Sequence, residues 1–199
     1  MMFIPALPAR NPALSIVRGE QIFSDAECDA IRQSGDRQAW REGKIGDAGE
    51  DRAEATVRSV LEQTLPVNPA NGFPLIRIIS EISRLNSELW YFDLTGFVPD
   101  DEAKLLSYRS AGGDHYNWHI DVGRGNTASR KLGFTVQLSE SAEYEGGDLE
   151  FHAVSSDRQA FRRKGLLLVF PAFWLHRVTP MTRGTRYAIV GWVHGPSFR

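Results

Sequence analysis

The stretch Trp118-His119-Ile120-Asp121 carries the strongest chemical signal in this chain of 199 residues. Its aromatic and apolar surroundings are typical of a short β-strand, and residues two apart in a strand project from the same face. We therefore expect His119 and Asp121 to point at one metal ion. A third ligand has to come from a distant strand, and His176 is the candidate. An H-x-D pair by itself often arises by chance, so the interpretation depends on the rest of the chain.

The half of the chain around this stretch is divided into short runs by glycine-rich or charged turns. This alternation of short runs and turns, from Tyr91 onward, is typical of a sandwich or barrel of short strands and not of alternating βαβ units. The runs that we predict as strands are 104–109, 116–122, 132–138, 148–152, 166–170 and 186–193. The second half is therefore predicted to be a double-layered β structure.

The first hundred residues are predicted to be mainly helical. Ser24 and Glu27 form the capping-box pattern that begins a helix. A second helix is predicted over about 51–63 and a third over about 74–89, because apolar residues recur there at helical spacing. The polar, glycine-containing segment 41–51 is predicted to be a loop. We expect the helices to back a β-sheet, which makes the fold class mainly β with N-terminal helices (α+β).

Length and composition fit one globular domain. A chain of this size allows one sizeable core, and no linker or internal repeat is visible. We expect a single domain over 1–199, with a helical part over about 1–100 and a β core over about 101–199. The residues are 42% hydrophobic and 24% charged, and the formal net charge is -2. This composition gives no electrostatic footprint for nucleic acid or for an anionic membrane.

Cysteine content and hydropathy predict a cytoplasmic protein. Cys28 is the sole cysteine, so neither an intramolecular disulfide nor a cysteine cluster for zinc can form, which suits a reducing compartment. We expect Cys28 to be a buried apolar residue on the first helix and not a reactive thiol. Residues 1–10 lack the apolar core of a signal peptide, and no apolar run reaches the roughly 18 residues of a membrane span.

Arg186 stands ten residues after His176 and changes how the metal ligands are interpreted. Two imidazoles and one carboxylate on one face of an octahedron leave three positions open, whereas a structural zinc site is closed by four protein ligands. An arginine guanidinium binds a carboxylate through two parallel hydrogen bonds. Alone, Arg186 would be interpreted as a surface charge, but beside His176 it can hold the far end of a dicarboxylate that chelates the metal.

Four blocks of sequence resemble the 2-oxoglutarate and iron(II) dioxygenase superfamily, specifically the prolyl 4-hydroxylase-like branch that includes the bacterial PKHD-type hydroxylases. The blocks are 113–121, 145–151, 165–171 and 176–192. They cover roughly residues 104–195, and the N-terminal half resembles the family only loosely. The resemblance implies a double-stranded β-helix, or jelly roll, with helices packed on its major sheet.

The resemblance also implies roles for individual residues. His119, Asp121 and His176 would ligate Fe²⁺, and Arg186 would bind the distal carboxylate of the co-substrate 2-oxoglutarate. The implied reaction uses O₂ to hydroxylate an unactivated C–H bond and releases succinate and CO₂. Asp121 argues against a halogenase, because those enzymes replace the carboxylate by a small residue.

Further residues are expected around the 2-oxoglutarate. Relatives commonly add a tyrosine upstream of the H-x-D pair, and Tyr108 is the candidate, one residue beyond the usual spacing. Tyr116 is the alternative. Thr135 and Gln137 share one face of a predicted strand and are expected near the 2-oxoglutarate pocket, with a solvent-facing position as the alternative.

The remaining expectations concern the pocket walls and the substrate entrance. Leu149 and Val178 are expected to be apolar walls, and Trp192 is either a third wall residue or a core aromatic. The segment 122–131 lies next to the metal strand and is interpreted either as a substrate lid or as a solvated loop.

The substrate is the least determined part of the prediction. A prolyl or other amino-acid or peptide substrate ranks first, and a small metabolite is the main alternative. Repair of nucleic-acid bases is not expected, because the chain lacks a basic surface. A metal-binding jelly-roll sensor without turnover and a cupin-type isomerase are alternatives from other classes, and neither explains Arg186 at its spacing. Ascorbate is a possible additional cofactor, and the oligomeric state is not predicted.

Overall fold

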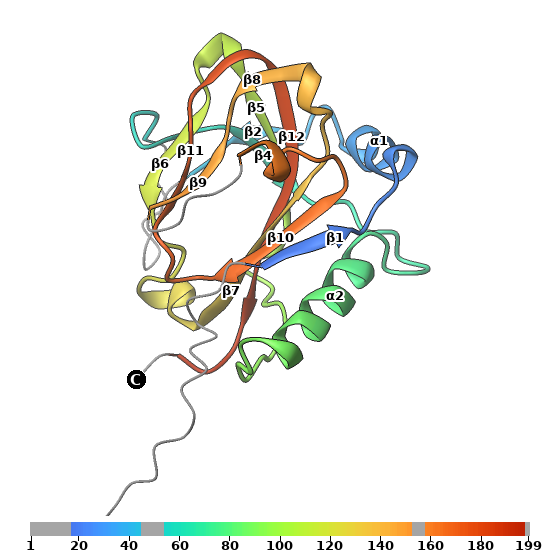
Figure 1. Ribbon diagram of the computed structural model, residues 1–199, viewed down its shortest axis with the longest axis vertical. Helices are drawn as coiled ribbons and strands as arrows, with labels where there is room; N and C mark the ends of the chain where they lie inside the picture. The colour runs from blue at the N-terminus through green and yellow to red at the C-terminus, as the bar shows by residue number, and fades with distance from the viewer. Residues whose placement is uncertain (1–16, 45–53, 153–157, 198–199) are drawn as a thin grey trace, which may run out of the picture.

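The computed structural model describes residues 17–44, 54–152 and 158–197. Two antiparallel sheets enclose an interior core and a cavity, and two helices lie against the outside of the larger sheet (Figure 1). The fold is α+β with a jelly-roll core, as predicted. Within the described ranges, no helix has both the length and the apolar character that crossing a bilayer requires.

The larger sheet has eight strands in the order β1-β10-β7-β12-β5-β4-β2, and β8 pairs with β12 beside this path. They are β1 (Val17–Gln21), β2 (Arg41–Glu42), β4 (Leu61–Thr64), β5 (Lys104–Arg109), β7 (Arg130–Gln137), β8 (Tyr144–Gly146), β10 (Leu166–Pro171) and β12 (Met181–His194). The long strand β12 lies between β5 and β7, so the sheet joins segments that are far apart in sequence.

The smaller sheet has four strands in the order β3-β6-β11-β9. They are β3 (Arg58–Ser59), β6 (His115–His119), β9 (Leu149–Phe151) and β11 (His176–Val178). Four short helical turns connect the strands, namely the 3-10 helices Ser110–Gly112, Gly125–Ser129 and Ser141–Glu143 and the one-turn helix α3 (Arg158–Phe161). Because the strands of this sheet are short, side chains near their ends lie next to connecting loops.

The central strands of the larger sheet are buried on both faces. Along β10, Leu167 and Val169 pack into the cluster that includes the helices, whereas Leu168 and Phe170 pack into the cluster between the sheets. This alternation follows from the two-residue period of a strand. It also explains why the run that forms β10 is apolar at every position.

Two helices, α1 (Asp25–Ser34) and α2 (Leu75–Glu88), cover the outer face of the larger sheet. α1 begins with the predicted capping box, in which the backbone N–H of Glu27 donates to Ser24 Oγ and the backbone N–H of Ser24 donates to the Glu27 carboxylate. Cys28 on α1 is fully buried, and burial raises the pKa of its thiol to about 11. A thiol in this state is not reactive, as expected.

The helix predicted over 51–63 is wrong for residues 54–63, the part of it that the structure describes. These residues lead into β3 and β4 instead. β3 pairs with β6 at the edge of the smaller sheet, and β4 lies between β5 and β2 in the larger one, so the segment adds one strand to each sheet. A short apolar pattern does not distinguish a strand from a helix, and here the two available sheet edges decide between them.

Most of the other predicted helices and strands correspond to observed elements. The third predicted helix corresponds to α2, and the six predicted strands correspond to β5, β6, β7, β9, β10 and the later part of β12. In the predicted loop 41–51, Arg41 and Glu42 pair with β4 as β2, and residues from 45 onward lie outside the described ranges. The strand β1 was not predicted. The first hundred residues thus add four short strands to the two sheets, and the single domain over 1–199 stays a prediction.

Candidate metal centre and its cavity

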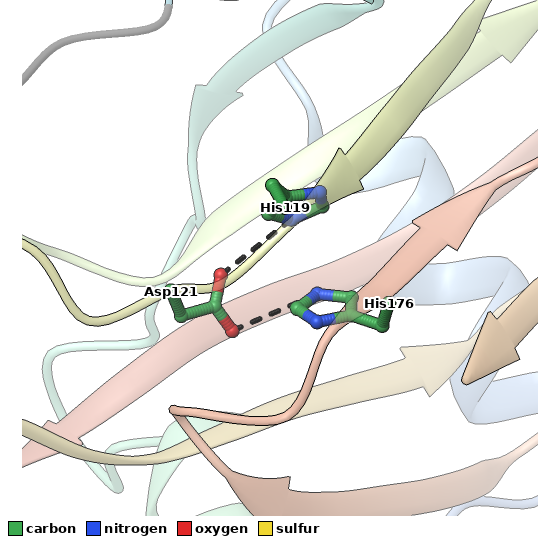
Figure 2. Close-up of side chains that lie close together, drawn as sticks. All are labelled: His119, Asp121 and His176. Carbon is green, nitrogen blue, oxygen red and sulfur yellow. Dashed lines mark ion pairs between the residues drawn. The ribbon is translucent and has the colours of Figure 1, made fainter. Parts of the chain in front are cut away.

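His119, Asp121 and His176 come together at the wall of the cavity between the two sheets (Figure 2). His119 is the last residue of β6, His176 is the first of β11, and the two are direct partners in the antiparallel pair. One potential ligand atom from each of the three residues lies within 4.8 Å of the others. Nε2 of each histidine is 3.7 Å from an Asp121 carboxylate oxygen, Oδ1 for His119 and Oδ2 for His176.

Asp121 does not lie on a strand, contrary to the prediction. β6 ends at His119, so the alternation of side chains along a strand does not account for the position of Asp121. The backbone N–H groups of Asp121 and Val122 instead donate to the carbonyl oxygen of Ala172, at 2.8 and 3.2 Å. The turn that precedes β11 therefore holds the Asp121 segment close to His176.

Both histidines present Nε2 to the shared space. Nδ1 of His119 is 2.7 Å from the carbonyl oxygen of Asn117, and Nδ1 of His176 is 2.8 Å from that of Trp174. A carbonyl oxygen only accepts, so Nδ1–H is the donor in each ring, and a neutral ring then keeps its lone pair on Nε2. Burial, followed by repulsion from His176, lowers the pKa of His119 to about 3, which keeps that ring neutral. Neutral imidazoles fixed in this way are suited to bind a metal.

A glycine leaves the room for the Asp121 carboxylate. A Cβ atom on Gly133 would lie 2.7 Å from Asp121 Oδ2 and 2.8 Å from the Phe170 ring. No side chain other than hydrogen therefore fits at this position of β7 without displacing the carboxylate or the ring. Two neutral imidazoles and one carboxylate in this cradle form a donor set that fits iron(II).

Aromatic rings surround the histidines. The ring of Tyr116, the alternative tyrosine of the sequence analysis, stacks on His119 with a centroid distance of 3.5 Å. The Phe151 and Phe170 rings lie 5.7 and 4.8 Å from His176. These contacts fix the orientation of both imidazole rings and keep that side of the cluster apolar.

The cavity beside the three residues has a volume of about 580 Å³ and is lined by strands of both sheets. This volume lies within the range of small-molecule sites. The predicted wall residues Leu149, Val178 and Trp192 all line it. Five residues of the segment 122–131 also line it, namely Val122, Gly123, Asn126, Thr127 and Arg130. That segment is therefore part of the cavity wall, and its role as a lid stays a prediction.

Arg186, on β12, is 5% exposed and lines the same cavity. Its Nε donates to Gln137 Oε1 at 2.9 Å, and its guanidinium lies 5.5 Å from the centroid of the Tyr108 ring. Among the described residues, no carboxylate forms an ion pair with Arg186. A buried cation without a counter-ion is unfavourable. An anionic ligand in the cavity would therefore complete the surroundings of this guanidinium.

Polar side chains on β7 surround Arg186. Gln137 is 3% exposed and also donates from Nε2 to the Tyr144 hydroxyl at 2.9 Å. Thr135 is 7% exposed and lines the cavity, and its Oγ1 has no hydrogen-bond partner within the described ranges. The solvent-facing alternative is thus wrong for both Thr135 and Gln137. Gln137 does not line the cavity itself; together with Tyr144 it borders a small pocket behind Arg186.

Two tyrosines therefore accompany Arg186. Tyr108 on β5 is the direct cross-strand partner of Arg186, is 3% exposed and lines the cavity, and burial raises the pKa of its hydroxyl. Tyr144 was missed by the sequence analysis. Its position two residues before the glycine pair Gly146-Gly147 was the available signal, but its approach to Gln137 depends on the tertiary fold.

Comparison with known protein families supports the resemblance of the second half of the chain to the 2-oxoglutarate and iron(II) dioxygenase superfamily. Residues 103–194 match the family described as the 2OG-Fe(II) oxygenase superfamily. A PKHD-type hydroxylase of Synechococcus sp. (strain CC9605) is 40% identical over 90 residues, which are 45% of this chain and 40% of the relative. A PKHD-type hydroxylase of Idiomarina loihiensis is 33% identical over 105 residues, which are 51% of this chain and 48% of the relative. These alignments span less than half the length of each relative.

Solved structures share the fold. A Pseudomonas putida prolyl-4-hydroxylase superposes with a TM-score of 0.63 at 19% identity and covers 91% of this chain and 92% of its own. A prolyl hydroxylase of Trichoplax adhaerens, in complex with a peptide fragment of the hypoxia inducible factor oxygen degradation domain, gives a TM-score of 0.66 at 19% identity and covers 90% and 83%. The jelly-roll fold is thereby confirmed, and the family match and the PKHD-type relatives confirm the predicted resemblance to this branch.

Proposed function

We propose that the protein is an iron(II)- and 2-oxoglutarate-dependent hydroxylase, since its residues 103–194 match the 2OG-Fe(II) oxygenase superfamily. It would hydroxylate an unactivated C–H bond, with prolyl or other amino-acid or peptide substrates ranked first. The observation that carries the proposal is the buried guanidinium of Arg186, which has no carboxylate partner among the described residues. It lines the same cavity as His119, Asp121 and His176.

In this proposal His119, Asp121 and His176 hold the iron, each through the ligand atom described above. Three protein donors leave open positions for a bidentate co-substrate and for O₂. When bound, iron(II) and 2-oxoglutarate supply the oxidising chemistry and release succinate and CO₂. The protein contributes neutral imidazoles, a fixed carboxylate and a site with room for these groups.

Arg186 anchors the distal carboxylate of 2-oxoglutarate. Gln137 accepts from Arg186 Nε, which leaves the outer nitrogens of the fork for the ligand. Thr135 Oγ1 is buried at the same wall and has no hydrogen-bond partner in the part of the chain that the structure describes, so it would donate to that carboxylate. Tyr108 also lines this wall and would be a second hydroxyl donor.

Apolar side chains would cover one side of the metal. Phe170, Leu149 and Val178 present apolar surface on the side of His176, and Trp192 lies on β12. A shielded, apolar site limits side reactions of the oxidising chemistry and strengthens the electrostatic contacts inside it. The Tyr116 ring stacks on His119 and covers one face of that imidazole ring.

Support for a peptide substrate comes from the Trichoplax adhaerens prolyl hydroxylase, which shares the fold and is described in complex with a peptide fragment. A small metabolite remains the alternative substrate, and neither nucleic acid nor a membrane is an expected partner. A cytoplasmic location and a requirement for ascorbate stay predictions.

A turnover assay of the full chain tests the proposal. The protein, loaded with Fe²⁺ without oxygen, would be exposed to 2-oxoglutarate, air and a panel of proline-containing peptides, free amino acids and small metabolites, with Asp121→Ala as the inactive control. We expect succinate in amounts equal to a gain of one oxygen on one class of substrate. Oxidation confined to metabolites would reject the peptide substrate. Metal binding without succinate formation under any condition would reject the enzyme in favour of a binding module.

A further inference from the structure

The backbone carbonyl of Asp121 is held by a side chain from another strand. Arg130, the first residue of β7, donates from Nη1 to the Asp121 carbonyl oxygen at 3.1 Å. Its Nε and Nη2 donate to Asp101 Oδ2 and Oδ1, each at 2.6 Å. One guanidinium thus binds a carboxylate through two parallel hydrogen bonds and still reaches the peptide group of Asp121.

Asp101 is itself fixed by a buried histidine. His194, at the end of β12, is 1% exposed and places Nε2 3.1 Å from Asp101 Oδ2. Its Nδ1 is 2.9 Å from Ser129 Oγ. Because Nε2–H donates to the carboxylate, Nδ1 accepts from the Ser129 hydroxyl. Nε2 therefore holds the Asp101 carboxylate, and the Ser129 hydroxyl holds the other ring nitrogen of His194.

An aromatic ring also packs against the planar face of the Arg130 guanidinium. It lies 3.5 Å from the centroid of the Trp192 ring on the neighbouring strand β12. His194 on β12 and Arg130 on β7 are cross-strand partners, so the two residues that bind Asp101 lie side by side. The four residues Arg130, Asp101, His194 and Ser129, which we name the Arg130 clamp, thus form a connected network in which Asp101 and His194 are buried and Arg130 and Ser129 are partly buried. Such a network has one arrangement, which is the property that a positioning device needs.

We propose that Arg130 is a positioning residue for the metal-ligating carboxylate of Asp121, an inference that rests on the proposed metal site. Asp121 lies beyond the end of β6, so no sheet ladder orients it. Its N–H is bound to Ala172 and its C=O to Arg130, so distant segments fix both of its backbone polar groups. With the backbone held, the carboxylate is directed over Gly133 and toward the two histidines.

The alternative is that Arg130 and Asp101 form an ion pair that only stabilises the fold. Lysine separates the two roles, because its ammonium is a single point charge and does not bind Asp101 and the Asp121 carbonyl in the geometry of a planar fork. Arg130→Lys keeps the charge pair and removes the clamp. Asp101→Asn is the second variant, since it keeps the shape of the acid and weakens its hold on the guanidinium.

Lys164→Met is the matched control. Lys164 is 7% exposed, its Nζ is 2.8 Å from Asp29 Oδ1, and neither residue lines the cavity. Its removal breaks a partly buried ion pair that has no contact with the metal site.

The test is calorimetric titration of the full chain and its variants with Co²⁺, together with the visible absorption spectrum of bound Co²⁺ and the Tm of each protein. We expect Arg130→Lys to lower Co²⁺ affinity about 10- to 100-fold, the range for groups that orient metal ligands. Asp101→Asn should lower it by less, both variants should alter the spectrum, and Lys164→Met should lower Tm with affinity and spectrum unchanged. Folded Arg130→Lys and Asp101→Asn proteins with wild-type affinity and spectrum would overturn the clamp alone. A wild-type chain that binds no Co²⁺ would overturn the metal site and the clamp together.

Discussion

The two ends of the cavity are built in different ways. At the metal end, His119 closes β6, His176 opens β11 and Asp121 lies in the connection beyond β6. At the arginine end, Arg186 lies within β12, directly opposite Tyr108 on β5. The metal end therefore uses the ends of short strands and a loop, whereas the arginine end uses the interior of the larger sheet.

This difference has a physical consequence. In the sheet, backbone pairing fixes where a side chain points, so Arg186 keeps its direction as long as β12 keeps its register. At a strand end, the direction of a side chain depends on hydrogen bonds from elsewhere, such as those that Asp121 makes with Ala172 and Arg130. We therefore expect the metal end to be sensitive to distant substitutions, and the arginine end to be sensitive to changes in the anchor itself.

The largest effect is expected at the metal end. Asp121→Ala removes one of the three donors and should reduce Co²⁺ affinity by more than the roughly 10- to 100-fold that changes outside the ligands cause. Turnover of 2-oxoglutarate should fall below detection. Asp100→Ala is the control, because Asp100 is an acidic residue that lines the same cavity outside the metal-ligand cluster. Equal Co²⁺ binding by Asp121→Ala and the wild type would reject the ligand assignment.

The second effect belongs to the arginine end. Arg186→Met should weaken 2-oxoglutarate binding by about 2–5 kcal/mol, the usual result of removing one partner of a buried charged contact. This corresponds to roughly 30-fold to several thousand-fold in Kd, measured by calorimetry on the Co²⁺-loaded chain. Co²⁺ affinity should not change, which separates the two ends. In the control Lys104→Met, a different cation is removed from the cavity wall, and 2-oxoglutarate affinity should persist. A loss of Co²⁺ affinity in Arg186→Met would show that the ends are not independent.

The arginine end was the more predictable of the two. Arg186 stands ten residues after His176, which is the spacing that led to its predicted role. The two-residue period of a strand puts Thr135 and Gln137 on one face. Local rules were sufficient there because the side chains lie inside regular strands. Tyr144 was missed because it reaches Gln137 from the separate strand β8, and no local pattern encodes that approach.

For the metal end, the sequence predicted which residues come together but not how the fold positions Asp121. The three donors were identified, yet Asp121 was assigned to a strand that ends two residues earlier. Tertiary hydrogen bonds decide its position, just as pairing with β5 and β6 turns the predicted helix over 51–63 into β3 and β4. In contrast α1 was predictable, because the capping box of Ser24 and Glu27 is a local signal.

A smaller effect at the metal end should follow from filling the space beside the carboxylate. Gly133→Ala adds a Cβ 2.7 Å from Asp121 Oδ2, and overpacking of this kind costs about 1–3 kcal/mol. If that energy acts on the carboxylate, Co²⁺ affinity falls roughly 5- to 150-fold. Gly191→Ala is the matched control, because its Cβ would lie 2.7 Å from the Phe134 ring and meet no metal ligand. Both variants should have a lower Tm, and an equal loss of Co²⁺ affinity in both would reject a specific role for Gly133.

The smallest effect concerns the unpaired hydroxyl at the arginine end. Thr135 Oγ1 is buried without a hydrogen-bond partner among the described residues, so Thr135→Val removes an unfavourable group from the protein alone. The free energy of unfolding should stay the same or rise. In the complex the same hydroxyl would donate to the 2-oxoglutarate carboxylate, so its loss should weaken binding by about 0.5–1.5 kcal/mol, or roughly 2- to 12-fold.

The opposite signs of these two changes make Thr135→Val informative despite its size. Denaturant unfolding of the apo chain measures the first, and calorimetry with 2-oxoglutarate on the Co²⁺-loaded chain measures the second. Thr64→Val is a control that should change neither, because this exposed residue at the end of β4 lies outside the cavity and its hydroxyl makes only a long, exposed contact of 3.4 Å with Glu102 Oε2. A destabilised Thr135→Val protein with unchanged 2-oxoglutarate affinity would mean that the hydroxyl supports the fold. The anchor would then consist of Arg186, held by Gln137, and its tyrosine neighbour, with no contact from Thr135.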